Sequence, residues 1–112
     1  MLDLSAVKRD RPVGRYAPSP TGRLHLGNLR TALLAWQECR NSNGIFILRI
    51  EDLDPPRTLP GAEEQMMEDL HWLGIDWDEG PDSDGAATPY RQSERSEIYE
   101  SAMKLLQDRQ LT

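Results

Sequence analysis

The chain contains 112 residues, of which 38% are hydrophobic and 29% are charged, a balance typical of a folded domain rather than a disordered segment. Nineteen acidic residues outweigh thirteen basic ones and give a net charge of −6, so any contact with RNA must use a local basic patch. No apolar run approaches the roughly 18 residues of a membrane span. The single cysteine, Cys39, excludes an internal disulfide and a multi-cysteine zinc site within this chain. We therefore expect a cytoplasmic location, no membrane contact and no metal ligands among these residues.

The first predicted elements are a polar lead-in, a strand and a helix. Residues 1–12 are polar, and we expect them to be solvated. Residues 13–17 read as a short buried strand that ends at Pro18, because proline cannot continue it. Apolar side chains at positions 26, 29, 33 and 36 then recur at helical spacing, which predicts a helix over residues 26–40 with these four on one face.

The later elements continue the alternation of strands and helices. Residues 45–50 are almost continuously apolar and predict a fully buried, parallel-type strand. A second helix is expected over residues 62–73, with its apolar face at Met66, Leu70 and Leu73. Three tryptophans, at positions 36, 72 and 77, are expected in the core.

The last predicted elements are a short strand over residues 89–92 and a third helix. Ser93 is a suitable N-cap for this helix, which runs to about residue 107. The whole order predicts an α/β fold with a parallel sheet and flanking helices. A sheet of three strands leaves its edges exposed, so we expect the chain to be the front of a longer protein. The alternative is a complete small domain that dimerises to cover those edges.

The strand–loop–helix connection up to residue 28 is the best candidate for a functional site. It directs the free amides of a helix's first turn at the space above the strand end, a geometry that suits anions. A phosphate-binding loop needs a lysine after its second glycine, but Asn28 follows Gly27 here, and the dinucleotide pattern G-x-G-x-x-G is absent. His25 can donate a hydrogen bond to a phosphate oxygen as charge develops. Gly27 allows a nucleotide to approach the backbone.

Four sequence blocks together resemble the glutamyl type of class I aminoacyl-tRNA synthetase. They are APSPTGRLHLGN at 17–28, LRIEDLD at 48–54, WLGIDWDEGP at 72–81 and YRQSER at 90–95. The resemblance implies that residues 13–112 are the N-terminal half of a Rossmann-like class I catalytic domain, truncated at its C-terminal end. It also implies an enzyme, monomeric when full length, that activates glutamate with ATP and Mg²⁺ and transfers it to tRNA.

The resemblance also assigns two groups of site residues. The ATP-binding signature comprises Pro18, Ser19, Pro20, Thr21, Gly22, His25, Leu26, Gly27 and Asn28. The catalytic members are His25, Gly27 and Asn28, although Asn28 departs from the more usual residues at the last position. The glutamate-binding residues are Arg15, Tyr16, Ala17, Pro18, Ser19 and Glu51. Arg15 is expected to bind the substrate carboxylate, because its planar fork matches two oxygens, and Glu51 the ammonium group.

Two branches of this family fit the sequence. The stretches HLGNLRTALLAW and EDLDPPR favour the branch that glutamylates the queuosine of tRNA(Asp), and the alternative is a synthetase that charges tRNA(Glu). More distant alternatives are a nucleotidylyltransferase with a related histidine element and a non-catalytic binding fragment. Arg91, Gln92 and Arg95 could serve either RNA contact or local structure. The lysine-rich second ATP signature and the zinc-binding cysteines of the first branch are absent from these residues, so zinc is possible only in the full-length protein. We expect the chain alone to be inactive.

Overall fold

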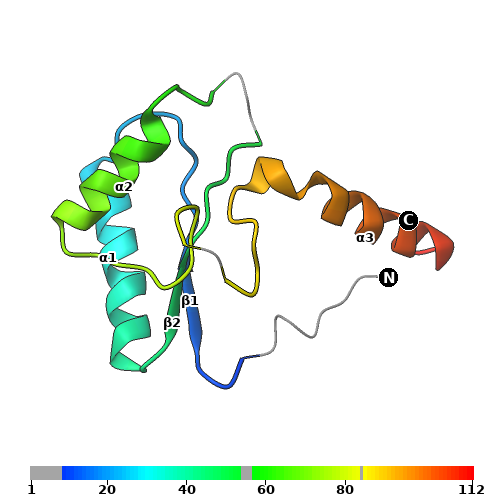
Figure 1. Cartoon of the computed structure of the whole chain (residues 1–112), viewed down its shortest axis with the longest axis horizontal. Coiled ribbons are helices and arrows are strands. Elements are labelled where there is room, and N and C mark those ends of the chain that lie inside the picture. Colours follow the sequence, from blue (N-terminus) through cyan, green and yellow to red (C-terminus); the bar gives the residue numbers. More distant parts are fainter. Residues whose placement is uncertain (1–8, 54–56, 84) are drawn as a thin grey trace.

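A two-stranded parallel sheet lies at the centre of the fold in the computed structural model, which describes residues 9–53, 57–83 and 85–112. The strands are β1 (Val13–Tyr16) and β2 (Ile45–Leu48), and Gly14 of β1 is in register with Phe46 of β2. Helix α1 (Leu26–Asn41) connects the two strands and packs against both. Figure 1 shows α1 and α2 (Ala62–Trp72) on one side of the strands.

The C-terminal part of the chain is helical and lies away from α1 and α2. The 3-10 helix η2 (Gln92–Arg95) leads directly into α3 (Ser96–Asp108). Figure 1 shows α3 extending outward on the opposite side of the strands from α1. The predicted α/β class, with a parallel sheet and flanking helices, is confirmed.

The strands differ from their predictions in length and burial. Both are shorter than expected, and each alternates between more and less exposed positions instead of being buried throughout. The predicted third strand is wrong: only Arg91 forms an isolated parallel bridge, with Ile50. The backbone cannot extend this pairing, because η2 begins at the next residue.

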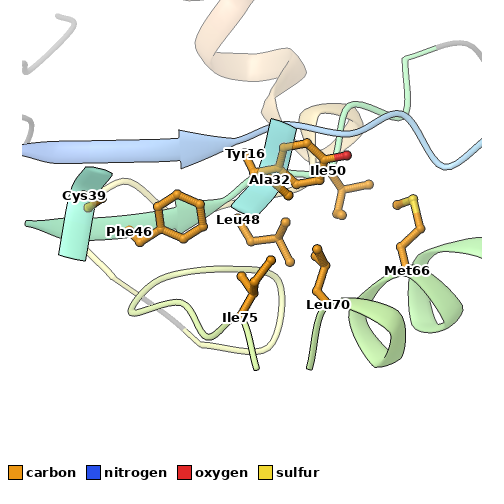
Figure 2. Close-up of a cluster of buried hydrophobic side chains, with 9 residues drawn as sticks. All are labelled: Tyr16, Ala32, Cys39, Phe46, Leu48, Ile50, Met66, Leu70 and Ile75. Atoms are coloured by element: carbon orange, nitrogen blue, oxygen red, sulfur yellow. The ribbon is translucent and has the colours of Figure 1, made fainter. Parts of the chain in front are cut away.

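The core lies between α1, the sheet and α2. Its nine buried side chains are Tyr16, Ala32, Cys39, Phe46, Leu48, Ile50, Met66, Leu70 and Ile75, all drawn in Figure 2. Met66 and Leu70 come from one face of α2, as predicted. Leu73, which was expected beside them, is 37% exposed and lies at the C-cap of the helix.

The face of α1 that enters the core is only partly the predicted one. Leu26 and Leu33 are exposed, whereas Ala32 and Cys39 are buried. The reason is the close approach of the helix to β1: a Cβ added at Gly14 would lie 2.9 Å from Cβ of Cys39. Small side chains on both sides permit this contact, so they define the buried face of the helix.

Two further predictions about single residues are wrong. Trp36 and Trp77 pack against the core, but Trp72 is 86% exposed. It follows the buried Leu70 by two positions, which turns it toward the other side of α2. Ser93 does not cap α3, because the N-cap is Arg95 and Ser93 belongs to η2.

Candidate active site

An open cleft of about 420 Å³ lies at the end of β1, where the chain turns into α1. Its lining residues are Tyr16, Ala17, Pro18, Ser19, Thr21, Gly22, Arg23, Leu24, His25 and Asn28. Most of the residues predicted to bind ATP or glutamate therefore lie around one cleft. Five predicted residues are outside this lining: Arg15, Pro20, Leu26, Gly27 and Glu51. Pro20 is buried, and Leu26 is exposed.

His25 is the N-cap of α1. Its Nδ1 accepts hydrogen bonds from the backbone N–H groups of Gly27, at 3.1 Å, and of Asn28, at 3.3 Å. Asn28 returns the interaction, because its Oδ1 accepts a hydrogen bond from the His25 backbone N–H at 3.2 Å. A ring whose Nδ1 accepts two hydrogen bonds carries its proton on Nε2. This leaves His25 Nε2–H as a donor at the mouth of the helix.

The arrangement of His25 changes the predicted anion site. The first-turn amides of α1 were expected to be free, but those of Gly27 and Asn28 donate to His25 Nδ1. The amide of Leu29 donates to the His25 carbonyl at 3.1 Å. An anion at this helix end would therefore meet the ring Nε2–H of His25 in place of these three amides.

The structure gives a further reason for glycine at position 27, which the sequence pattern did not reveal. A Cβ at this position would lie 3.0 Å from Cε1 and 3.1 Å from Nδ1 of His25. Either contact is tighter than an ordinary van der Waals distance, so a side chain would push the imidazole out of its capping position. Glycine at position 27 is therefore coupled to the orientation of the His25 ring.

Arg15 and Glu51 lie together beside the cleft, at the carboxyl ends of the two parallel strands. Arg15 Nη1 is 3.6 Å from Glu51 Oε1, and Arg49 Nη2 is also 3.6 Å from the same oxygen. The Arg15 side chain is 60% exposed. The structure thus places a guanidinium and a carboxylate side by side, and a ligand that carries both a carboxylate and an ammonium group can replace this pair.

The arginines of the YRQSER block serve local structure. Arg91 forms a two-pronged ion pair with Glu63 of α2, with Nε–Oε1 at 2.7 Å and Nη2–Oε2 at 3.1 Å. Arg95 Nη1 donates to the carbonyl oxygens of Ala87 and Pro89, at 2.9 and 2.8 Å. Of the two uses left open by the sequence, the structure favours local structure over RNA contact for both arginines.

Glu79 is a buried carboxylate that sequence analysis did not single out. It accepts hydrogen bonds from Arg9 Nη2, at 2.8 Å, and from the Tyr90 hydroxyl. Burial raises the pKa of Glu79, but these two hydrogen bonds, the charge of Arg9 and a backbone hydrogen bond from Ala86 together outweigh it and hold the pKa below its usual value. Burial, together with the bond to Glu79, raises the pKa of Tyr90 to about 12. Arg9 is thus bound to the domain, contrary to the prediction of a solvated lead-in, while residues 1–8 lie outside the described residues.

Metal-ligand clusters and membrane-spanning helices are the next features to consider in the described residues. Within residues 9–53, 57–83 and 85–112, no three histidine, cysteine, aspartate or glutamate side chains are grouped so that they could hold a metal ion. None of the helices in the described part of the chain is long and apolar enough to cross a membrane.

Known proteins with similar sequences point to the same kind of site. A family model described as "tRNA synthetases class I (E and Q), catalytic domain" matches residues 13–110. The chain is 57% identical over 101 residues to a glutamate–tRNA ligase of Lacticaseibacillus casei, covering 89% of this chain and 20% of that protein. It is 60% identical over 94 residues to a glutamyl-Q tRNA(Asp) synthetase of Symbiobacterium thermophilum, covering 84% of this chain and 29% of that protein.

A solved structure gives the same result at the level of the fold. The crystal structure of a glutamate tRNA ligase from Elizabethkingia meningosepticum, in complex with its amino acid, superposes with a TM-score of 0.84 at 47% identity. The match covers 88% of this chain and 20% of that one. The chain therefore spans about a fifth of the length of the glutamate–tRNA ligases it matches. The family resemblance is confirmed, and the chain belongs to the class I tRNA synthetases (E and Q), within their Rossmann-like catalytic domain.

Proposed function

We propose that the chain is the N-terminal part of the catalytic domain of an enzyme that activates glutamate with ATP and transfers it to tRNA(Glu). The observation that carries this proposal is the pairing of Arg15 with Glu51 next to the cleft that His25 borders. Glutamate has a carboxylate for Arg15 and an ammonium group for Glu51. Binding of the amino acid would exchange one long ion pair for two closer ones.

The chemistry follows from the same residues. The α-carboxylate of glutamate, and not the side-chain carboxylate that Arg15 would bind, attacks the α-phosphorus of ATP, and pyrophosphate leaves. The reaction therefore needs no nucleophile from the protein. His25 donates from Nε2 to a phosphoryl oxygen whose charge increases in the transition state. Arg15 and Glu51 hold the amino acid in the position for attack. Mg²⁺ is brought by the phosphates of ATP, which are its usual ligands in such sites.

The choice of acceptor rests on the relatives. The sequence-based preference for the queuosine of tRNA(Asp) depended partly on Pro55 and Pro56, which lie outside the described residues. Relatives of both kinds match at similar identity, while two solved relatives with a TM-score of 0.84 are a glutamate tRNA ligase and a glutamate-tRNA synthetase. We therefore favour tRNA(Glu). The 60% identity to a glutamyl-Q tRNA(Asp) synthetase supports tRNA(Asp) as the second candidate.

Two assays on the full protein test this proposal. Glutamate-dependent exchange of pyrophosphate into ATP measures activation, and it is run with and without tRNA. Transfer of labelled glutamate to purified tRNA(Glu) and to queuosine-bearing tRNA(Asp) then identifies the acceptor. Efficient charging of tRNA(Glu) supports the main proposal, and loading of tRNA(Asp) alone supports the second candidate. Exchange driven by another amino acid and not by glutamate would refute both.

A further inference from the structure

The segment that carries Glu51 is held by the backbone from two sides. On one side, the amides of Arg49 and Glu51 donate to the carbonyls of Tyr16 and Pro18, at 3.0 and 2.9 Å. On the other side, Ile50 donates to the Tyr90 carbonyl and accepts from the Gln92 amide, both at 2.8 Å. Residues 49–51 are therefore enclosed between the end of β1 and the start of η2.

The side chain of Asp52 reinforces the second of these contacts. Its Oδ1 accepts a hydrogen bond from the Ser93 backbone N–H at 2.8 Å, and its Oδ2 accepts one from the Ser93 hydroxyl at 2.7 Å. Hydrogen bonds to an ionised carboxylate are stronger than those between neutral groups. We call this pair of bonds the Asp52–Ser93 clasp. It connects the LRIEDLD block to the YRQSER block and occupies both oxygens of the carboxylate.

The Glu51 side chain, in contrast, has only weak contacts of its own. Its two ion pairs, with Arg15 and Arg49, are both 3.6 Å long, and the side chain is 35% exposed. Ion pairs that are long and exposed hold a carboxylate loosely. The position of the Glu51 carboxylate therefore depends on its backbone, which the neighbouring clasp helps to fix. A binding site needs its charged groups held within about 0.5 Å of their working positions.

We propose that the Asp52–Ser93 clasp is a positioning element for Glu51, and that neither of its residues touches the substrate. By binding Ser93, Asp52 fixes the backbone that follows β2, so that Glu51 keeps its place opposite Arg15 when an amino acid binds. The inference rests on the proposed function, because it takes Glu51 as the partner of the glutamate ammonium group. It also explains why the YRQSER block, whose arginines are engaged in local structure, bears on the amino acid site.

The test compares KM values for glutamate and ATP in pyrophosphate exchange by the full protein. Asp52→Asn and Ser93→Ala are each expected to raise the glutamate KM by about tenfold, which is the loss of one charged hydrogen bond, and to leave the ATP KM unchanged. The double variant should be little worse than Asp52→Asn alone, because Ser93→Ala removes one of the two hydrogen bonds that Asp52→Asn already weakens. Ser93→Thr retains the hydroxyl and should restore the glutamate KM.

Matched controls and a milder variant keep the test decisive. Ser96→Ala and Asp108→Asn make the same chemical changes at exposed positions of α3 and should leave both KM values unchanged. Ser93→Ala removes only the hydroxyl bond and retains the backbone one, so it is the variant to use if Asp52→Asn does not fold. An active enzyme whose glutamate KM is unchanged in Ser93→Ala, or whose two KM values rise together, would overturn the inference alone. A wild-type protein without glutamate-dependent exchange would overturn the proposed function, and the clasp's role with it.

Discussion

Arg40 Nη1 lies 2.7 Å from Asp78 Oδ2, and this ion pair joins the end of α1 to the loop that follows α2. Asp78 also accepts a hydrogen bond from the Phe46 backbone N–H at 2.8 Å, so it connects α1 to the first half of β2. Arg40 Nη2 forms a second ion pair with Asp76, at 3.0 Å, and Trp36 Nε1 donates to Asp76 at 2.7 Å. One arginine therefore ties the helix to two carboxylates of the loop, those of Asp76 and Asp78.

This network predicts a loss of stability in acid. The hydrogen bond from Trp36 is the main cause that lowers the pKa of Asp76, with Arg40 adding to it. For Asp78, burial raises the pKa, but Arg40 and the Phe46 amide outweigh it. Both carboxyls thus have a lower pKa in the folded state. Their stabilisation is fully present above the unfolded pKa values, near 4, and is lost as the pH falls through the lowered ones.

Arg40→Met tests the network directly. Because both carboxylates are still partly exposed, screening limits the expected loss to about 1 kcal/mol of unfolding free energy at neutral pH. The loss should shrink below about pH 3. Urea unfolding at both pH values measures it, with Arg30→Met, at an exposed position of α1, as the control. An equal loss at both pH values would mean that Arg40 acts through packing and its hydrogen bond to the Gly44 carbonyl, and not through the two ion pairs.

His25 has two separable roles, and two substitutions separate them. His25→Ala removes the helix cap and the Nε2 donor, so it should destabilise the protein by about 1 kcal/mol and slow adenylate formation by on the order of 100-fold or more. His25→Asn supplies another good cap without Nε2, so it should restore stability but not the rate. Thermal unfolding and single-turnover adenylate formation provide the two readouts. A His25→Asn enzyme with the wild-type rate would assign His25 to capping only.

Gly27→Ala should weaken catalysis without weakening the fold. Alanine inside a helix is normally more stable than glycine by about 0.5–1 kcal/mol, but here its Cβ would press on the His25 ring at 3.0 Å. Because displacing the ring also removes the helix cap, at a cost of about 1 kcal/mol, the two effects nearly cancel. We expect a nearly unchanged melting temperature together with a lower kcat, measured in pyrophosphate exchange. A fully active variant would show that the ring has room to shift.

Arg15→Ala and Glu51→Gln should each raise the KM for glutamate by about tenfold to a hundredfold and leave ATP binding nearly unchanged. Each removes one charge that the substrate pairs with, and leaves the other unbalanced in the site. Initial rates at varied glutamate and varied ATP separate the two effects, with Arg30→Ala as the control. If Glu51→Gln keeps the wild-type glutamate KM, Glu51 is not the partner of the ammonium group.

Much of this fold follows from local sequence patterns. The apolar run at Ile45–Leu48, the helical spacing in α1 and the glycine after α2 predict the order of the elements and the parallel sheet. The buried face of α1 could not be predicted in this way. It depends on the approach of Cys39 to Gly14, two positions that lie on different elements.

The candidate site, too, could be predicted only in part from the sequence. The residues around the cleft are continuous in sequence, so the resemblance to the synthetase family could identify them. The hydrogen bonds from Ser93 to Asp52 could not be predicted, because the two residues are 41 positions apart in the sequence. A serine before a helix is most often its cap, and only the tertiary structure shows that this one binds Asp52 instead.

Because α1 packs closely on β1, the reactivity of the buried Cys39 thiol reports on the contact between this helix and this strand. Cys39 is the single thiol in the sequence, and it is 6% exposed on the face of α1 that packs against β1. Separation of α1 from the strand would expose this sulfur further, so an increase in its alkylation rate reports the opening of that interface. Since the same helix begins at His25, a ligand that holds the imidazole in place should slow the alkylation of a sulfur atom fourteen residues further along.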